Sequence, residues 1–269
     1  MTEKIPKIII IVPYRDREED RKEFIKRMPT ILKHLQYKIF IIHQHDKRLF
    51  NRGAIKNIGF LAVKERYPHH YKDITLVFND VDTMPRRKYQ FSYNTHANSV
   101  NHFYGYTQTL GGIFAIKGQD FERINGFPNI WTWGLEDNSV KMRCDKHQIP
   151  INRKEFISWR ESHKILALPH GNKRIISPNI EPKLSQNSDT DGISTLFKIK
   201  YQMFDIAPTI EEVLVDHFET PEGFSSPFIK FARLYDQKLF PTLDKQIKVI
   251  NNKVTILSGK RSHGKLLFH

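Results

Sequence analysis

The sequence has a single cysteine, Cys144, among its 269 residues, so no disulfide can form within the chain. The lack of disulfides favours a reducing compartment, and we expect a cytoplasmic location. Long apolar stretches are also missing. The run near the start, Ile8 to Val12, is far too short to span a bilayer and lacks the cleavage pattern of a secretory signal. We therefore expect a soluble protein with no transmembrane segment, although a chain trimmed of an anchor would look the same.

An arginine-rich arm is missing as well. The net charge of +14 and the pI of about 9.7 bring nucleic acid, an anionic membrane and an acidic glycan into consideration as partners. The Lys and Arg residues are scattered, however, with no arginine-rich arm and no nucleic-acid-binding motif. We therefore favour a generally basic, solvated surface over nucleic-acid binding. These patterns do not indicate an oligomeric state.

What is present is enough apolar sequence for one sizeable α/β domain, since 39% of the residues are hydrophobic. Short β-branched runs predict strands, and apolar residues at helical spacing predict helices between them. The predicted order is strand 7–12, helix 17–35 with a kink at Pro29, strand 38–42, helix 54–63 and strand 74–78. This alternation predicts a Rossmann-like, mostly parallel central sheet flanked by helices, which binds ligands at the carboxyl ends of its strands.

The second half of the chain is less regular. Residues 83–112, rich in Asn, His and Tyr, are expected to be irregular. The elements expected after them are a strand at 113–116, a helix from about Gln119, a helix around 140–144, a strand at 165–168, a strand pair at 195–204 and 210–215, a linker at 221–227, a short helix, and a hairpin at 247–257 that turns at Asn251-Asn252. The change of character divides the chain into a main domain, residues 1–218, and a C-terminal extension, residues 219–269.

Two carboxylates, Asp80 and Asp82, follow the strand predicted at 74–78. Alternate residues of a strand point to one face, so both side chains can reach the same place beyond its carboxyl end. Hard oxygen ligands there suit Mg²⁺ or Mn²⁺, the ions that accompany diphosphates. The alternative is a polar turn after a strand.

Two further clusters lie where strands lead into helices. Arg15 follows the first strand and could bind a diphosphate in a bidentate manner; the alternative is a charged helix start. Phe50 and Arg52 precede the second helix, where they could stack a nucleobase and hold a phosphate. The alternative for Phe50 is packing under a turn.

A third cluster combines aromatic and acidic residues in the segment Trp133-Gly134-Leu135-Glu136-Asp137. Aromatic faces bind sugar rings, and a neighbouring carboxylate can act as general base on a hydroxyl. His170 follows the strand predicted at 165–168 and could supply a nitrogen ligand to a metal held by Asp82; by itself it would be an ordinary surface or core histidine.

The order of the motifs resembles that of the β1,4-galactosyltransferases, glycosyltransferase family 7, which have the GT-A fold. The motifs are Pro-Tyr-Arg-Asp-Arg, Phe-Asn-Arg-Gly, Asp-Val-Asp, Gly-Gly, Asn-Gly-Phe-Pro-Asn and Trp-x-Trp-Gly-x-Glu-Asp. A later stretch, 191–216, is similar to the end of that catalytic domain. The resemblance covers roughly residues 7–218, which would then form a GT-A glycosyltransferase catalytic domain.

The resemblance implies a metal-dependent, inverting transferase. It would move galactose or N-acetylgalactosamine from a UDP-sugar to a hydroxyl of a glycan or glycoconjugate acceptor, with β1,4 linkage and with Mn²⁺, or alternatively Mg²⁺, as cofactor. The implied roles are UDP binding for Arg15, Phe50 and Arg52; donor binding for Asp80 and Gly112; contacts with the donor sugar and acceptor for Trp133, Gly134 and Glu136; the general base for Asp137; and metal ligation for Asp82 and His170. The alternative is a catalytically inactive glycan-binding protein of the same fold, against which the intact Asp82, Glu136 and Asp137 argue.

Several positions depart from the family pattern. Leu135 replaces a usual glycine, and the resulting Trp-Gly-Leu-Glu-Asp is similar to chondroitin-type N-acetylgalactosaminyltransferase domains. Thr109 replaces a tyrosine linked to galactose preference and would leave room for an N-acetyl group. Asn138 stands at a position that is often acidic, and Ala167 stands where some members have a methionine ligand, with His163 as the alternative metal ligand. Thr109 and Leu135 are therefore the expected determinants of donor specificity.

Overall fold

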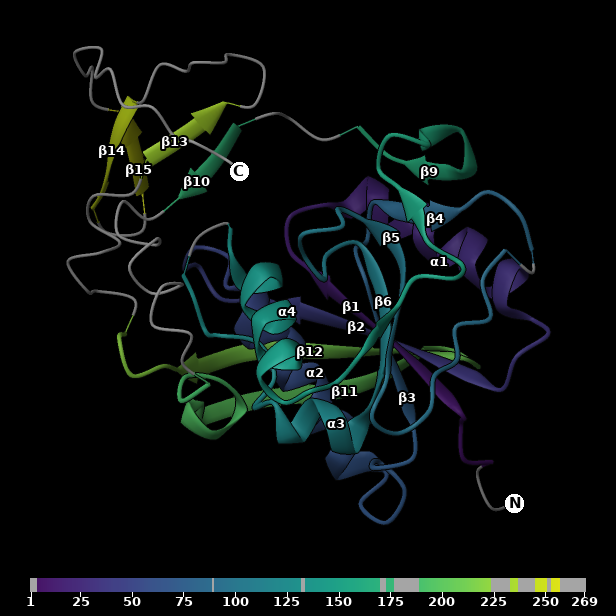
Figure 1. Ribbon diagram of the computed structural model, residues 1–269. Helices are drawn as coiled ribbons and strands as arrows, with labels where there is room; N and C mark the ends of the chain where they lie inside the picture. The colour runs from purple at the N-terminus through teal and green to yellow at the C-terminus, as the bar shows by residue number, and fades with distance from the viewer. Residues whose placement is uncertain are drawn as a thin grey trace.

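The computed structural model describes residues 4–88, 90–131, 134–169, 173–176, 189–223, 233–236, 245–250 and 253–256. Figure 1 shows the chain with its elements labelled. The first half has the predicted order: β1 (Ile8–Tyr14), α1 (Glu18–Leu32), β2 (Tyr37–Gln44), α2 (Arg52–Arg66) and β3 (Thr75–Asn79). Pro29 lies inside α1. The α/β prediction is therefore confirmed.

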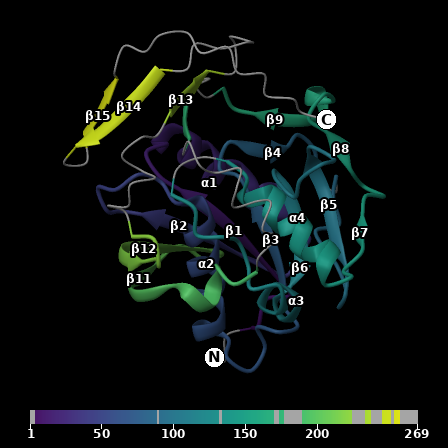
Figure 2. The same cartoon turned by 60° about the vertical axis from the view of Figure 1, so that its left-hand side comes forward.

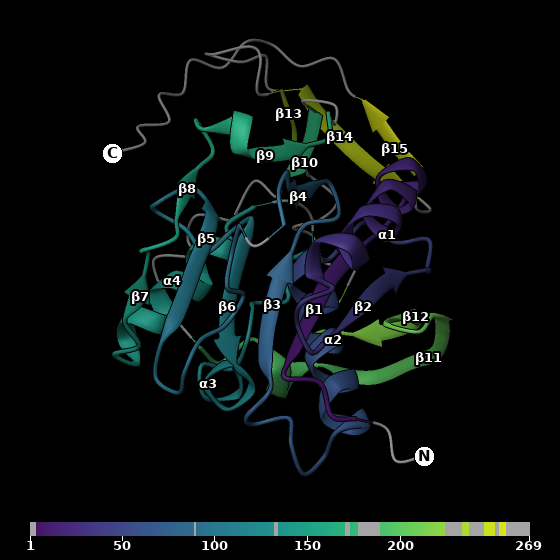
Figure 3. The same ribbon diagram turned by 90° about the vertical axis from the view of Figure 1, so that its right-hand side faces the viewer.

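A nine-stranded sheet forms the centre, with the order β11-β12-β2-β1-β3-β6-β5-β7, and β8 also pairs with β5. The strands follow this order across Figure 3. β1 lies between β2 and β3 and is parallel to both. The sheet is mixed, because β6 (Ile113–Lys117) is antiparallel to β3 and to β5.

The two faces of β1 show why the sheet is covered on both sides. Its even-numbered apolar residues, such as Ile10, pack in one core cluster with Phe24 and Met28 of α1. Its odd-numbered residue Ile11 belongs to a second cluster with α2, α3 (Gly118–Arg123) and α4 (Glu136–Lys146). A Cβ atom on Gly59 of α2 would lie 2.7 Å from Ile11 Cγ2, so glycine allows α2 to pack close to the sheet.

The segment expected to be irregular contains two strands, β4 (Thr83–Pro85) and β5 (Val100–Gly105), so that prediction was wrong. The polar residue His102 is buried within β5, which hides the apolar alternation typical of a strand. The short strands β7 (Ile151–Asn152) and β8 (Ile157–Ser158) pair with β5. β9 (Ile165–Ala167) pairs with β4, and the two lie side by side in Figure 2.

The late strand pair is confirmed as β11 (Phe197–Ala207) and β12 (Ile210–Glu219), and β12 joins the central sheet beside β2. Two 3-10 helices lie at Ser162–Lys164 and Ile193–Thr195. In the part of the chain that the structure describes, no helix is long and apolar enough to cross a bilayer.

A second sheet has the order β10 (Lys173–Ile176), β13 (Arg233–Asp236), β14 (Lys245–Ile250) and β15 (Lys253–Ile256). β14 and β15 form the expected hairpin, whose turn, Asn251-Asn252, lies outside the described residues. The described residues between the linker and the hairpin form β13, and the expected short helix has no counterpart among them. Because β10 precedes residue 218, the second sheet takes a strand from each side of the expected boundary, which itself stays a prediction.

Candidate active site at the carboxyl edge of the sheet

Asp80 and Asp82 lie on a turn rather than on a strand. β3 ends at Asn79, and the Thr83 amide donates a hydrogen bond to the Asp80 carbonyl oxygen at 3.1 Å. The expectation that strand alternation aligns the two side chains was therefore wrong. Each carboxylate meets its own guanidinium: Asp80 Oδ1 lies 2.5 Å from Arg52 Nη2, and Asp82 Oδ2 lies 3.4 Å from Arg17 Nη1.

Arg52 is the first residue of α2 and connects two acidic segments. The Asn51 side chain accepts a hydrogen bond from the Ala54 amide and so caps this helix. Besides Asp80, Arg52 pairs with Glu136, with 3.4 Å between Nη1 and Oε1. Burial would lower the pKa of Arg52, but the surrounding carboxylates, with Asp80 foremost, raise it well above its ordinary value.

Glu136 and Asp137 form the acidic first turn of α4. The chain enters this helix through Gly134 at φ +113° and Leu135 at φ +67°. Lys56 of α2, which sequence reasoning missed, donates to Asp137 Oδ1 at 2.8 Å and lies 3.9 Å from Glu136 Oε1. It lies four residues after Arg52, and that spacing places both cations on one face of a helix.

The surroundings shift the pKa values of the two carboxyl groups of this turn in opposite directions. Burial raises the pKa of Glu136, and the neighbouring Asp137 charge adds to this. Burial would raise the pKa of Asp137 too, but Lys56 and Arg52 lower it below its ordinary value. Asp137 is therefore the carboxylate that stays ionised, as a general base must be.

The segment 110–112, which contains the predicted pair Gly111-Gly112, links the two acidic segments through backbone hydrogen bonds. The Asp80 amide donates to the Gly112 carbonyl oxygen at 3.4 Å, and the Leu110 amide donates to the Asp137 carbonyl oxygen at 3.1 Å. Gly112 has φ +78°, and a Cβ atom there would lie 2.4 Å from the Tyr104 carbonyl oxygen. Only glycine fits this position without displacing β5.

Thr109 and His102 surround Gly111 beside the predicted base. A Cβ atom on Gly111 would lie 2.7 Å from Asp137 Oδ2. Thr109 Oγ1 accepts a hydrogen bond from the Gly111 amide at 3.3 Å, so Thr109 adjoins the site, and its role in donor specificity stays a prediction. His102 Nε2 lies 3.0 Å from the Gly111 carbonyl oxygen. Burial lowers the pKa of His102 to about 4, so this histidine is neutral and its Nε2 carries the proton.

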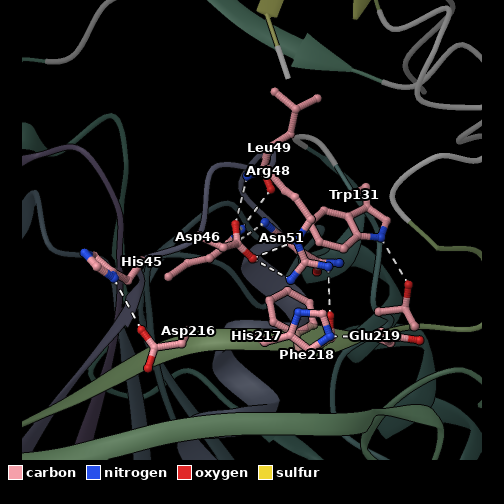
Figure 4. Close-up of polar contacts among 12 residues, drawn as sticks. His45, Asp46, Arg48, Leu49, Asn51, Trp131, Asp216, His217, Phe218 and Glu219 are labelled. Atoms are coloured by element: carbon pink, nitrogen blue, oxygen red, sulfur yellow. Dashed lines mark hydrogen bonds and ion pairs between the residues drawn. The ribbon is translucent and has the colours of Figure 1, made fainter. Parts of the chain in front are cut away.

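Arg15 contacts a neighbouring cluster whose members Asp46, Arg48, Trp131 and Phe218 are labelled in Figure 4. Arg15 pairs with Asp46 at 3.3 Å, and Asp46 also binds Arg48 Nε at 2.7 Å. Arg48 lies over the ring of Trp131, 4.7 Å from its centroid, and Trp131 stacks on Phe218. This cluster anchors the 45–51 loop that leads into α2. Phe50 is half-buried against the core, which agrees with the packing alternative and leaves nucleobase stacking a prediction.

The predicted metal ligands are described only in part. Trp133 and His170 lie outside the described residues, and within these residues no group of three or more His, Cys, Asp or Glu side chains could hold a metal ion. The pairing of β4 with β9 continues to Leu168, whose amide donates to the Asp82 carbonyl oxygen at 2.8 Å. The chain two residues before His170 therefore lies at Asp82. His163, the alternative ligand, is exposed on the 3-10 helix Ser162–Lys164.

The sheet topology and the acidic, arginine-lined carboxyl edge of the sheet define the GT-A fold of nucleotide-sugar transferases. Two family profiles match in tandem: "N-terminal region of glycosyl transferase group 7" over residues 3–94 and "N-terminal domain of galactosyltransferase" over residues 92–170. The chain is 30% identical over 212 residues to the xylosylprotein 4-β-galactosyltransferase of Caenorhabditis elegans, covering 72% of this chain and 71% of that protein. The chain belongs to glycosyltransferase family 7, the β1,4-galactosyltransferase family.

Further relatives agree with this assignment. Mouse β-1,4-galactosyltransferase 1 is 30% identical over 223 residues, which cover 78% of this chain and 54% of the mouse protein, so the chain spans about half the length of that relative. The catalytic domain of Drosophila β1,4-galactosyltransferase 7 superposes with a TM-score of 0.65 at 22% identity, over 79% of this chain and 95% of that one. A mutant of the same Drosophila protein, solved in complex with manganese, UDP-Gal and xylobiose, also gives 0.65, at 24% identity and with the same coverage. These superpositions support the GT-A fold.

Proposed function

We propose that the protein is a metal-dependent, inverting glycosyltransferase that moves galactose or N-acetylgalactosamine from a UDP-sugar to a glycan hydroxyl, forming a β1,4 linkage. The observation that carries this proposal is the Asp80–Arg52–Glu136 contact, which joins the donor-side turn to the acidic start of α4. Family membership sets the reaction class, and the ionised Asp137 beside Glu136 supplies the base that the reaction needs.

In this proposal the cations of the edge bind the donor. Arg15 and Arg52 pair with the diphosphate, Phe50 contacts the uracil, and Asp80 and Gly112 hold the nucleotide sugar in place. Asp82 and His170 would hold Mn²⁺, which neutralises charge on the leaving diphosphate when bound. The placement of Leu168 at Asp82 and the manganese of the Drosophila complex support this assignment.

The acceptor side is assigned to the start of α4. Asp137 removes the proton of the acceptor hydroxyl while that oxygen attacks the anomeric carbon from the face opposite the diphosphate, so the configuration inverts. Glu136 Oε1 is buried and has no hydrogen-bond partner among the described residues, which suits an acceptor of a sugar hydroxyl hydrogen. Trp133 and Gly134 are assigned to the walls around the sugars.

The choice of donor and of acceptor is the finer part of the proposal. Thr109 adjoins Gly111 beside Asp137, and its small side chain leaves space for an N-acetyl group, so we include UDP-N-acetylgalactosamine as a donor. The C. elegans relative is named for xylosylproteins, and the Drosophila complex contains xylobiose. Xylosides therefore belong in the acceptor panel beside other glycans. The cytoplasmic location stays a prediction.

The test is UDP release from a panel of UDP-sugars, with and without acceptors, in Mn²⁺, in Mg²⁺ and in a chelator. We expect acceptor-dependent release that stops in the chelator and returns with Mn²⁺. Asp137→Asn should keep UDP binding and lose about 10²–10⁴-fold in kcat, and Asp82→Asn should weaken Mn²⁺ binding. No release with any donor would refute the proposal, and glycan binding without transfer would favour the inactive glycan-binding alternative.

A further inference from the structure

Lys56 is a buried cation in the middle of the proposed active site. It lies one turn after Arg52 on α2, and 2% of its surface is exposed. Its ammonium group contacts Asp137 Oδ1 at 2.8 Å, lies 3.9 Å from Glu136 Oε1, and lies 4.3 Å from the centroid of the Phe127 ring. Burying a lysine is costly unless it is paired, so this position requires a partner that stays charged.

The surroundings of Asp137 show which group controls it. The charged and titratable groups that face it are Lys56 and Arg52 from α2, Glu136 from α4 and His102 from β5. Arg52 divides its contacts between Asp80 and Glu136, whereas Lys56 hydrogen-bonds Asp137 directly. His102 is buried and neutral. Lys56 is thus the cation that fixes the Asp137 carboxylate.

The geometry assigns different tasks to the two oxygens of Asp137. Oδ1 accepts from Lys56, whereas Oδ2 makes no hydrogen bond to the described residues, the Asp137 side chain is 19% exposed, and Oδ2 lies so close to Gly111 that a Cβ atom there would be only 2.7 Å away. We propose that Lys56 is a positioning residue. By holding Oδ1 of Asp137 it directs Oδ2 to the acceptor hydroxyl, and its charge keeps this carboxylate ionised. This inference rests on the proposed transfer reaction.

The proton balance follows from this assignment. Oδ2 takes the proton of the acceptor hydroxyl as the new oxygen–carbon bond forms and the bond from the anomeric carbon to the diphosphate oxygen breaks. Lys56 keeps its proton throughout and stabilises the carboxylate before the transfer. Without this charge the pKa of Asp137 rises, so the base is neutralised at a higher pH and activity is lost earlier on acidification.

The experiment compares Lys56→Met and Lys56→Arg with the wild type. As a matched control we choose Lys64→Met, which removes a more exposed lysine of the same helix that pairs with Glu122. We expect Lys56→Met to move the acid limb of the kcat/KM profile up by about one pH unit and, because Oδ2 loses its fixed orientation, to lower kcat on the pH-independent plateau about tenfold, with the donor KM changed less than twofold. Lys56→Arg should restore the wild-type limb, and Lys64→Met should match the wild type. An unchanged acid limb in Lys56→Met would overturn the proposal.

Two further measurements keep the test independent. Lys56→Gln, which keeps a hydrogen-bond donor but no charge, replaces Lys56→Met if that variant does not fold, and the same shift is expected. Carbon-13 NMR of the Asp137 carboxyl group reads its pKa without any transfer reaction. If the wild type transfers no sugar, the proposed function fails; a raised Asp137 pKa in Lys56→Met would then still support the assigned pairing, and an unchanged pKa would refute it.

Discussion

The two acidic segments of the edge, Asp80–Asp82 and Glu136–Asp137, have similar composition but different surroundings. The side chains of Asp80 and Asp82 are 27% and 16% exposed and meet arginines from two separate elements. Glu136 is 5% exposed at the start of α4 and faces two cations of one helix, Arg52 and Lys56. Asp137, at 19%, is about as exposed as Asp82, so the two segments differ less in exposure than in their counter-ions, because the second pairs with a buried lysine, Lys56.

The difference indicates a division of labour. The 3.4 Å pair of Asp82 and Arg17 joins two partly exposed side chains, so Asp82 can exchange this guanidinium for a bound ion at small cost. Asp137, which is also partly exposed, pairs with the buried Lys56 at 2.8 Å, and this fixed lysine favours its ionised form and one orientation. Arg52 contacts both segments, so in the proposed reaction it would couple the donor side to the acceptor side.

Replacing Arg52 should affect both acidic segments, and we expect this substitution to have the largest effect on stability and UDP binding. Arg52→Met leaves Asp80 and Glu136 without their shared cation, and we expect a loss of about 3 kcal/mol in the free energy of unfolding together with a loss of about 100-fold in UDP affinity. Arg21→Met is the matched control, because Arg21 has the same 18% side-chain exposure and pairs with Glu212 at 2.6 Å. Urea unfolding and calorimetric UDP titration should show a stability loss in both variants and an affinity loss in Arg52→Met alone. Equal UDP affinity in the two variants would contradict the coupling role.

The buried His102 should make the folded protein less stable at acidic pH. Its pKa is lowered by burial to about 4, whereas the unfolded chain takes up this proton near pH 6.5. The unfolded state therefore binds more protons between these values, and stability falls as the pH decreases from 6.5 to 4, by about 3 kcal/mol for this group. In His102→Gln this part of the loss should disappear, and in His69→Gln, an exposed control, it should remain. Unfolding free energies measured from pH 7 to 4 would refute the assignment if the His102→Gln curve ran parallel to that of the wild type.

Much of the fold and part of the site could be predicted from the sequence. Apolar periodicity located β1, α1, β2, α2 and β3, and parallel strands place their carboxyl ends at one edge. The family resemblance implied donor binding for both Arg52 and Asp80, and the structure shows the two side chains in contact.

The remaining features depend on long-range packing. The position of Lys56 against Asp137 depends on how α2 packs against α4, which no local pattern encodes. The sequence predicted no role for Arg17, which contacts Asp82, whereas Arg15, the predicted diphosphate ligand, pairs with Asp46, because the turn into α1 decides which arginine points to the edge. β5 was missed because it buries His102, a residue that normally indicates exposed sequence.

A substitution at Thr109 tests whether the surroundings of Asp137 also determine which UDP-sugar is used. Thr109→Tyr places a large ring beside Gly111 and Asp137, so we expect the ratio of UDP-galactose to UDP-N-acetylgalactosamine use to rise about tenfold. Thr107→Tyr, at an exposed position of the same turn, should leave the ratio unchanged. The measurement is kcat/KM for both donors with one acceptor. An unchanged ratio in Thr109→Tyr would mean that donor choice lies elsewhere.

Leu135 provides the smallest and most local test, because it separates backbone strain from specificity. It has φ +67° at the start of α4, a conformation that disfavours side chains other than glycine. We expect Leu135→Gly to raise the free energy of unfolding by about 1 kcal/mol. Gln148→Gly is the matched control, since Gln148 has φ +55° just after the same helix and is exposed. Both variants should gain stability in urea. Only Leu135→Gly should also change the donor ratio, because Leu135 directly precedes Glu136; if both variants leave the ratio unchanged, Leu135 affects stability alone and Thr109 is the remaining determinant.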